Sequence, residues 1–319
     1  MSLEIVSLRE KYLEDAAALV CLRLKALRER LPLLSPRYEQ VGTIHAMLRD
    51  LSRETAGVVA MRNGRLIGFL TGIDLPAFLG KRSVYSPEWA NGAVLGESRR
   101  IYEEMYSSLS AEWTADGCYS HIVSLLVNDR EGIEAWNWLG FGLAVVDGVR
   151  ELKMVEGLTS DVKVRQAGVK DIDEVVALRR ALERHLASAP TFWLHESQDC
   201  EEWLGKPGNV LWLAYESGEA VGCMGLENRS EDGCKILQDE GTVSIENAFT
   251  REGARGRGVA TALLNQALEW ACGEGYKRCV TDFEAMNILA ARFWMRWFEP
   301  VCYSLMRCID ERIVIKLSN

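Results

Sequence analysis

The chain has 319 residues, 48% of them hydrophobic and 26% charged, with a formal net charge of −9 at pH 7. Its length is too great for one typical core and sufficient for two, and its composition is that of an ordinary globular protein. The negative charge argues against binding to nucleic acid or to anionic membranes, because both attract a basic surface.

The remaining composition favours a reduced, metal-free protein. No apolar run reaches the length of a membrane span, and the first residues lack a signal-peptide pattern, so we expect a cytoplasmic location. The nine cysteines include no CxxC pair, and none of the four histidines is spaced with a cysteine as a zinc site requires. Cys223, Cys279 and Cys302 fall in apolar, strand-like runs, where cysteine usually packs as a small hydrophobe.

The first half of the chain shows a clear order of elements. Residues 6–9 (VSLR) read as a short strand, and Asp15 opens a helical pattern of apolar residues. Residues 58–68 (VVAMRNGRLIG) read as two strands joined by a turn at Asn63 and Gly64. A glycine-containing stretch at 91–98 (NGAVLGES) precedes a helix over 99–113, and a strand over 121–127 leads into a helix with Trp136.

The second half repeats this order. It has a strand at 162–165 (VKVR), two strands around the turn at Ser217 and Gly218, and a strand at 278–283 before a helix with Trp294. The pairs Arg9/Arg165, Gly64/Gly218 and Trp136/Trp294 are 156, 154 and 158 residues apart, a nearly constant offset. We therefore predict two tandem domains of one fold, residues 1–156 and 157–319, joined in the polar stretch at 155–160.

A run of glycines and arginines stands between a strand and a helix in the second half. Residues 241–249 (GTVSIENAF) favour a strand, and residues 250–261 (TREGARGRGVAT) contain three glycines and three arginines. Residues 262–272 are amphipathic, with apolar side chains at Leu263, Leu264, Ala267, Leu268 and Ala271. A helix N-terminus offers unpaired N–H groups and a positive dipole to an anion, and arginines add forked donors. The run predicts a phosphate site, with an ordinary charged turn as the alternative.

Residues 255–260 (RGRGVA) lack the GK[ST] of a P-loop and resemble the R/Q-x-x-G-x-G/A signature of the GNAT superfamily of N-acetyltransferases. The element order of each half is also similar to that of a GNAT domain. The resemblance implies an α/β (α+β) fold of two tandem GNAT-like domains, each a mixed, mostly antiparallel sheet flanked by helices. It also implies that residues 157–319 bind acetyl-CoA as co-substrate through Ala248, Phe249, Thr250, Arg255, Gly256, Arg257, Gly258, Val259, Ala260, Thr261 and Asn287.

The corresponding stretch of the first half, residues 91–98, contains glycines but no arginine. Glu97 would stand where phosphates approach, and a like charge there weakens anion binding. We therefore expect residues 1–156 to be a degenerate domain without a phosphate loop; a second working site in this half is the alternative.

Acetyl transfer to an amine requires a base for the ammonium, a donor for the carbonyl oxygen and an exit for the thiolate. By resemblance, the backbone N–H of Phe249 is the expected oxyanion donor. Glu246 is the expected base and lies on the face of Thr250 in a regular strand, a relation that a β-bulge would break. A solvated or ion-paired strand glutamate is the alternative for Glu246, and its rivals as base are Glu240, Asp282 and Glu284.

Residues 287–294 (NILAARFW) resemble the N-x-x-A-x-x-[FL]-Y segment of the family. The resemblance gives Asn287 a contact with pantetheine, and helix capping is the structural alternative. Trp294 replaces the tyrosine often credited with protonating the thiolate, and indole is no practical acid. Tyr303 is a candidate substitute, with packing in a core as its alternative. Because a thiol like that of cysteine has a pKa of roughly 8.5, a missing acid should slow the reaction without abolishing it.

These patterns predict an acetyl-CoA-dependent N-acetyltransferase, an acyltransferase that acts on a primary amine of a small molecule or a protein. A catalytically inactive CoA- or acyl-CoA-binding sensor or scaffold is the alternative, motivated by Trp294 and by the degenerate first half. Transfer of a longer acyl group is a third possibility. The sequence identifies neither the acceptor nor the choice between monomer and homodimer, and we expect no nucleic-acid or membrane partner.

Overall fold

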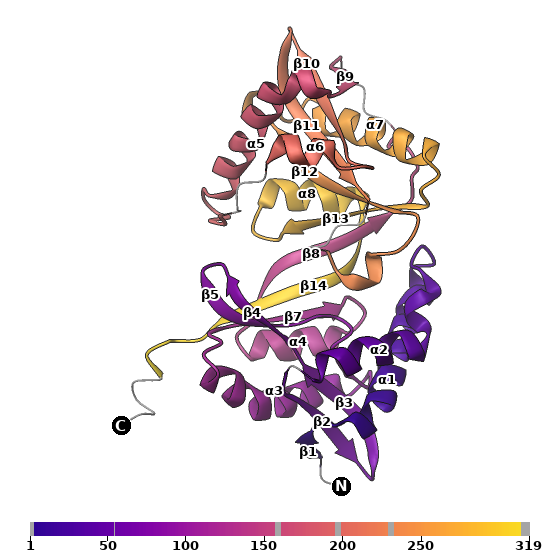
Figure 1. The fold of residues 1–319 in the computed structure, drawn as a ribbon, viewed down its shortest axis with the longest axis vertical. Helices are drawn as coiled ribbons and strands as arrows, with labels where there is room; N and C mark the ends of the chain where they lie inside the picture. Colours follow the sequence, from indigo (N-terminus) through magenta and orange to yellow (C-terminus); the bar gives the residue numbers. More distant parts are fainter. Residues whose placement is uncertain (1–2, 54, 157–160, 195–198, 229–232, 314–319) are drawn as a thin grey trace. The chain divides into compact units, whose positions relative to one another are not determined.

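The computed structural model describes residues 3–53, 55–156, 161–194, 199–228 and 233–313. The contacts within the chain divide it into two compact units. Unit 1 comprises Met1–Val146, Cys234–Ile236 and Pro300–Asn319, and unit 2 comprises Asp147–Gly233 and Leu237–Glu299. Both units combine helices with β-sheet (Figure 1). Within the described residues, no helix has the length and apolarity needed to cross a membrane.

The strands of unit 1 form two groups. The order β1-β2-β3-β6 is antiparallel throughout and is built from β1 (Glu4–Ser7), β2 (Gly57–Arg62), β3 (Arg65–Thr71) and β6 (Asn91–Ala93). The order β4-β5-β7-β14 has one parallel pair, β5 with β7, and is built from β4 (Ile73–Phe78), β5 (Lys81–Ser86), β7 (Ser120–Leu126) and β14 (Glu299–Cys308). The helices are α1 (Leu13–Arg30), α2 (Val41–Leu51), α3 (Ser98–Ala115) and α4 (Arg130–Trp138).

Unit 2 contains one mixed sheet in the order β8-β13-β12-β11-β10-β9. Its strands from β9 to β12 pair antiparallel, and β12 runs parallel to β13. The strands are β8 (Gly142–Arg150), β9 (Lys163–Gln166), β10 (Val210–Glu216), β11 (Glu219–Glu227), β12 (Thr242–Thr250) and β13 (Arg278–Glu284). The helices are α5 (Ile172–Leu186), α6 (Cys200–Gly205), α7 (Val259–Gly273) and α8 (Ile288–Trp297).

The two predicted hairpin turns have the same backbone geometry. Asn63 and Gly64 have φ values of 52° and 74°, and Ser217 and Gly218 have φ values of 50° and 89°. Two consecutive residues with positive φ match a turn whose twist agrees with that of the flanking strands. Both turn predictions are confirmed.

Helices cover both faces of the sheet in unit 2 (Figure 1). A Cβ built on Gly222 of β11 would lie 3.2 Å from Leu263 and from Val259 of α7, whereas one built on Gly225 would lie 2.6 Å from the ring of Trp203 of α6. Because residues an odd number apart on a strand point to opposite faces, α7 and α6 lie on opposite sides. The predicted apolar positions of α7, among them Leu264 and Leu268, are all buried.

The core of unit 1 is rich in aromatic rings. The ring centroid of Trp136 on α4 lies 5.1 Å from that of Tyr106 on α3 and 4.7 Å from that of Phe141. Both contacts are edge-to-face, the arrangement that aromatic quadrupoles favour. The tryptophan-bearing helix predicted from the sequence therefore anchors the core of this unit.

The chain does not divide between the units at a single point, as the prediction of domains 1–156 and 157–319 assumed. Strand β14 pairs antiparallel with β7 of unit 1 over seven residues, from Cys302 opposite Leu126 to Cys308 opposite Ser120. The residues of β8 from Asp147 onward instead belong to unit 2. The last strand of the second half thus belongs to unit 1, and the last strand of the first half passes from unit 1 into unit 2, because ladder pairing joins segments far apart in the sequence.

Candidate active site

Strand β12 contains a bulge in the part predicted to hold the thioester. Phe249 lies opposite Cys223 of β11, whereas Glu246 lies opposite Gly225. Three steps along β12 correspond to two along β11, so β12 carries one extra residue at 247–248. Asn247 there has a φ of 54°, in the left-handed region that asparagine tolerates better than most residues.

The bulge places Glu246 and Thr250 on opposite faces of the sheet. Gly225, opposite Glu246, lies on the face of Trp203 and α6, and Gly222, opposite Thr250, lies on the face of α7. The shared face expected for a regular strand is therefore wrong, because the extra residue reverses the alternation. Glu246 is half-buried on the side of the sheet that α5 and α6 cover.

The backbone of Phe249 points toward β11. The N–H of Arg251 donates to the carbonyl oxygen of Val221 at 2.8 Å, and hydrogen-bonded positions alternate along an antiparallel ladder. Phe249 comes two residues earlier, and its carbonyl oxygen lies 2.9 Å from a Cβ built on Gly222 of β11. The N–H of Phe249 therefore belongs to the ladder, in disagreement with its predicted role as oxyanion donor. By the same alternation, the N–H of Thr250 points to the other edge of β12.

That other edge of β12 is only partly used by its neighbour. Within the described ladder, β12 pairs with β13 over three residues, Thr242–Ser244 with Arg278–Val280. The described ladder between the two strands ends at Ser244, whereas β12 itself continues to Thr250. A strand edge that extends beyond its ladder is suited to pairing with an extended amide chain.

The loop after β12 ends at an exposed helix N-terminus, as predicted. Gly256 and Gly258 have φ values of 74° and 80°, so both adopt the left-handed conformation that glycine allows without strain. Gly258 is the residue before α7 and accepts from the N–H of Ala262. Among the described residues, no backbone hydrogen bond engages the N–H groups of residues 256–261. These groups, at the positive end of α7, form a site for an anion.

Each arginine of the loop is held by a partner in unit 2. Arg255 donates from Nε to the carbonyl oxygen of Thr250 at 3.0 Å, and its guanidinium lies 5.8 Å from the ring centroid of Phe249. Arg257 pairs through Nη2 with Oε2 of Glu216, the last residue of β10, at 2.7 Å. The loop is thus fastened to strand ends, while its positive charge remains at the surface.

Asn287, the residue predicted to contact pantetheine, caps helix α8. Its Oδ1 accepts from the N–H of Ala290 at 3.4 Å, and the side chain is 6% exposed. The same Oδ1 lies 3.3 Å from Nε2 of His185, in the last turn of α5. The ring of His185 is in turn 6.3 Å from that of Phe249, measured between centroids. The structure thus brings Phe249 and Asn287 together through His185.

Sequence reasoning assigned no role to His185. Helical periodicity places it seven residues after Leu178, on the buried face of α5, but no pattern links the end of α5 to the start of α8. A second residue without an assigned role is Arg179 of α5, which donates to Oδ1 of Asn247 in the bulge. Arg179 stands at the same place in the second half as Arg23 does in the first, and this repeat was the sequence signal that could have pointed to it.

A buried thiol adjoins the bulge. Cys223 Sγ donates to the carbonyl oxygen of Asn247 at 3.1 Å, and burial raises the pKa of this thiol to about 12. A thiol that stays protonated is a poor nucleophile, so Cys223 contributes packing to the site. The nine cysteines, all of them described, form no disulfide.

Both aromatic residues considered for the thiolate proton pack against hydrophobic side chains of their own unit. Trp294 is 6% exposed and packs edge-to-face on Phe298, with ring centroids 5.3 Å apart. Tyr303 pairs with Leu125 of β7 and packs against the core of unit 1, which is the structural alternative for it. The phosphate loop and β12 belong to unit 2.

The three rivals of Glu246 lie at strand ends or in a connection. Asp282 and Glu284 are half-buried near the end of β13, and Glu240 is exposed just before β12. Within the described ranges, no cluster of three or more His, Cys, Asp or Glu side chains is arranged to hold a metal ion.

Unit 1 differs at the place that corresponds to the phosphate loop. Gly96 has a positive φ, 87°, and in this respect it resembles Gly256 of unit 2. The residue directly before α3, however, is Glu97. Glu97 Oε2 pairs with Nη1 of Arg62, the last residue of β2, at 2.6 Å. The predicted carboxylate therefore stands at the start of the helix, as expected for a loop that repels phosphate.

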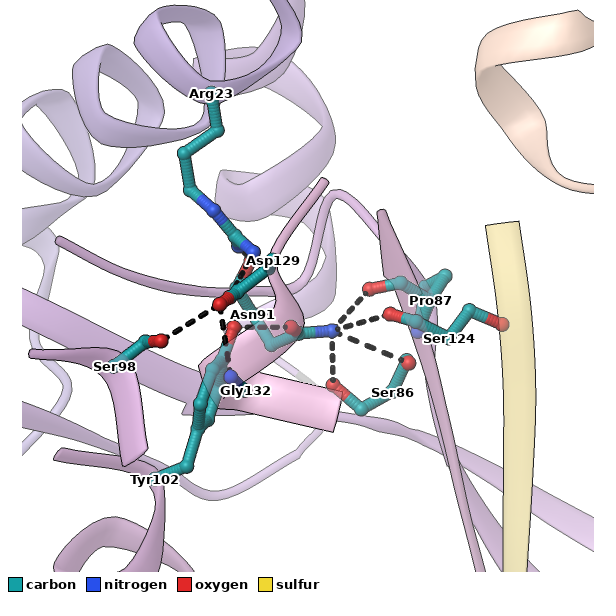
Figure 2. Close-up of polar contacts among 9 residues, drawn as sticks. All are labelled: Arg23, Ser86, Pro87, Asn91, Ser98, Tyr102, Ser124, Asp129 and Gly132. Atoms are coloured by element: carbon teal, nitrogen blue, oxygen red, sulfur yellow. Dashed lines mark hydrogen bonds and ion pairs between the residues drawn. The ribbon is translucent and has the colours of Figure 1, made fainter. Parts of the chain in front are cut away.

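A buried polar network crosses the same part of unit 1 (Figure 2). Asp129 accepts from Nη2 of Arg23 and from Oγ of Ser98, each at 2.6 Å, and from the N–H of Gly132 at 2.9 Å. The backbone carbonyl oxygen of Asn91 accepts from Nη1 of Arg23 at 3.3 Å. All of these side chains are at most 2% exposed. The network ties α1, α3 and α4 together where unit 2 has the starts of α7 and α8.

One part of the chain matches a family of known proteins. The acetyltransferase (GNAT) family matches residues 178–298, which contain β12, the glycine loop and the start of α8. The N-acetylaspartate synthetase of Xenopus tropicalis is 26% identical over 120 residues, 37% of this chain and 40% of that protein. That of Danio rerio is 28% identical over 97 residues, 30% of this chain and 32% of that protein. The chain thus aligns with less than half the length of these relatives.

Solved structures resemble the fold over nearly the whole chain. The GCN5-related N-acetyltransferase from Sphaerobacter thermophilus has a TM-score of 0.56 at 13% identity and matches 96% of this chain and 95% of its own. A GCN5-related glucosamine N-acetyltransferase region of a fungal multi-domain β-N-acetylglucosaminidase has a TM-score of 0.52 at 13% identity, over 96% of this chain and 38% of that one. At such identities the likeness establishes the fold, and it confirms the predicted fold class. Residues 178–298 match the acetyltransferase (GNAT) family, and the fold of the chain is that of GCN5-related N-acetyltransferases of known structure.

Proposed function

We propose that this protein transfers an acetyl group from acetyl-CoA to a primary amine and that unit 2 binds the acetyl-CoA. The observation that carries the proposal is the N-terminus of α7. There, the N–H groups of residues 256–261 lack backbone partners among the described residues, and two glycines hold the loop in a left-handed conformation. The pyrophosphate would accept from these N–H groups, with the dipole of α7 favouring its charge.

The open edge of β12 supports binding of the rest of the cofactor. Pantetheine is an extended chain with amide groups, and it would pair with the edge of β12 near Thr250, beyond the point where the ladder with β13 ends. The N–H of Thr250 then replaces that of Phe249 as the donor proposed for the thioester oxygen. Asn287, at the start of α8, remains the side chain proposed to contact pantetheine.

The acceptor would approach from the face covered by α5 and α6. Glu246 lies on this face and is the carboxylate proposed to remove the proton of the ammonium, directly or through water. Arg179 on α5 contacts the bulge at Asn247 and pairs with Glu183 at 3.3 Å. A guanidinium near the acceptor favours amines that also carry a carboxylate, and two relatives are named N-acetylaspartate synthetases. L-Aspartate is therefore the first acceptor to test, before glucosamine and spermidine.

Binding is tested by titrating the protein with acetyl-CoA in a calorimeter. Gly256→Asp places a carboxylate in the loop and should weaken binding by at least about 100-fold, because it repels the phosphates at the end of α7. The matched control is Gly96→Asp in unit 1. Both glycines have positive φ and no heavy atom within 4 Å of an added Cβ, so the backbone cost is equal. Equal loss in both variants, or none in Gly256→Asp, would contradict the proposed loop.

Catalysis is tested by thiol release from acetyl-CoA in the presence of each amine. Glu246→Gln should lower kcat by about 100-fold while leaving the Kd for acetyl-CoA within twofold of the wild type, because it removes a base and no cofactor contact. Glu240→Gln is the control, since Glu240 is exposed outside β12. A rate that falls equally in both variants excludes Glu246 as the base.

A binding protein without activity is the second candidate function. Burial of Trp294 against Phe298, at the position of the family's tyrosine, favours it. This candidate predicts heat on titration with acetyl-CoA but no thiol release with any amine of the panel. Detectable turnover with one acceptor would exclude it.

A further inference from the structure

We propose that His185 carries a proton from the attacking amine to the sulfur of CoA, a role that rests on the proposed transferase function. The structure places this imidazole between two groups assigned to the cofactor. Its Nε2 is 3.3 Å from Oδ1 of Asn287, and its ring is 6.3 Å from that of Phe249, between centroids. His185 is half-buried and comes from α5, on the face of the sheet that also bears Glu246.

The hydrogen bonds around Asn287 determine which nitrogen of His185 carries hydrogen in the neutral ring. The cap bond from the N–H of Ala290 requires an acceptor, so the atom at that position of the Asn287 amide is the oxygen. The same oxygen faces Nε2 of His185, which must therefore be the donor. The lone pair of the neutral imidazole then resides on Nδ1, and no hydrogen bond among the described residues engages that atom.

The reaction has a place for such a group. Once Glu246 has taken the first proton from the ammonium, the neutral amine attacks the carbonyl carbon and forms the C–N bond. The nitrogen must then lose one proton, and the sulfur gains one when the C–S bond breaks. Nδ1 of His185 accepts the proton from nitrogen and donates it to sulfur, so His185 ends as it began and no other reactant is needed. The products are the amide and CoA thiol.

The surroundings explain why a histidine would be used. Trp294 stands where the family signature has a tyrosine, and its indole is buried against Phe298. Tyr303 packs on the core of unit 1. The cap bond of Asn287 keeps Nε2 as the donor and leaves the basic nitrogen, Nδ1, without a hydrogen bond among the described residues.

The experiment compares thiol release by the wild type, His185→Ala and His185→Gln, with the best acceptor of the three amines named above. We expect kcat to fall by about 100-fold in both variants, with the Kd for acetyl-CoA within twofold of the wild type. Added imidazole should restore at least about a tenth of the rate to His185→Ala and should not accelerate the wild type. Rescue distinguishes a proton carrier from a packing residue, because a structural loss does not respond to a free base.

His45→Ala is the matched control, since this histidine is half-buried in α2 of unit 1. It should retain the wild-type rate. Suppose that the wild type is active. If His185→Ala then keeps the wild-type kcat, or loses activity that imidazole does not restore, the role of His185 is overturned and the transferase function is not. A wild-type protein that binds acetyl-CoA and releases no thiol overturns the transferase function, and the role of His185 with it.

Discussion

The two units contain the same surface ion pair with opposite polarity. In unit 1, the cation Arg62 ends the first strand of the hairpin, and the anion Glu97 precedes the helix. In unit 2, the anion Glu216 ends the corresponding strand, and the cation Arg257 precedes the helix. Both pairs join the end of a strand to a glycine loop, so the loop is fastened whether the cation or the anion lies on it. Only the polarity of unit 2 leaves a positive loop at the helix N-terminus, which favours the approach of an anion.

The interior shows a second difference between corresponding positions. Asp129 and Asn287 both cap the helix that follows, by accepting from the N–H three residues later. In unit 1 the cap is a carboxylate, which also binds Arg23 and closes the space between helices with a buried ion pair. In unit 2 the cap is a neutral amide, and Arg179 instead contacts the bulge of β12. Unit 1 joins these two residues in one buried ion pair, whereas unit 2 uses them separately, at the cap of α8 and at the bulge of β12.

The largest expected effect tests the buried pair. Asp129→Asn keeps the helix cap but leaves Arg23 charged and unpaired in a site where both side chains are at most 2% exposed. We expect it to lower the free energy of unfolding by about 3–5 kcal/mol. Asn287→Ala, at the corresponding position, should cost only about 1 kcal/mol, the value of a cap. Denaturant unfolding of both variants measures the difference, and equal losses would show that the ion pair does not hold unit 1 together.

The next effect concerns Glu88, a buried carboxylate of unit 1 that accepts from the N–H of Ile236 at 2.9 Å. Burial raises the pKa of Glu88 from 4.5 to about 7. Between these values the folded protein keeps a proton that the unfolded chain has lost, so the free energy of unfolding falls as the pH rises through this window. The loss reaches the order of 3 kcal/mol above pH 7.

Glu88→Gln should remove this dependence, because glutamine keeps the acceptor for Ile236 without the charge. We expect the variant to exceed the wild type in free energy of unfolding by about 3 kcal/mol at pH 8 and by under about 1 kcal/mol at pH 5. Urea denaturation at the two pH values measures both differences. A stability gap independent of pH would contradict the raised pKa.

A charge swap separates structure from binding at the loop of unit 2. The double variant Glu216→Arg with Arg257→Glu reproduces the polarity of unit 1. Because the pair is exposed, we expect the free energy of unfolding to change by less than about 1 kcal/mol. The Kd for acetyl-CoA should nevertheless rise by about 10- to 100-fold, since an anion replaces the cation.

The control swap, Arg62→Glu with Glu97→Arg in unit 1, should leave the Kd unchanged. Calorimetric titration measures both variants. Wild-type affinity after the swap in unit 2 would mean that the backbone alone binds the phosphates and that loop polarity is irrelevant.

The smallest effect comes from Glu216 alone. Glu216→Gln releases Arg257 from its ion pair, so we expect acetyl-CoA to bind about two- to fivefold more tightly at low salt. The gain should disappear as salt screens the loop. Glu97→Gln should have no effect, and an unchanged Kd in Glu216→Gln would show that the pair with Glu216 does not compete with the phosphates.

The sequence predicted those parts of the site that depend on neighbours along the chain. The turn at Gly256 and Gly258 depends only on the backbone freedom of glycine, and α7 depends only on the spacing of its apolar residues. The turn and the helix were therefore predicted correctly. The role of Glu97 followed from its place just before a helix. The caps and hairpin turns are local for the same reason, because their hydrogen bonds join residues a few positions apart.

The face of Glu246, the direction of the Phe249 N–H and the position of His185 depended on tertiary structure. A single extra residue at Asn247 reverses the alternation of a strand, and the pattern of side chains does not mark it. The place of β14 in unit 1 likewise depends on a ladder between residues far apart in the sequence. The sequence by itself determined the glycine loop, the helix behind it and the repeat of the fold, because these follow from short-range backbone geometry and hydrophobic period. The tertiary structure alone decided which side chains meet around the open edge of β12, because long-range pairing, and no local rule, sets the register and face of each strand.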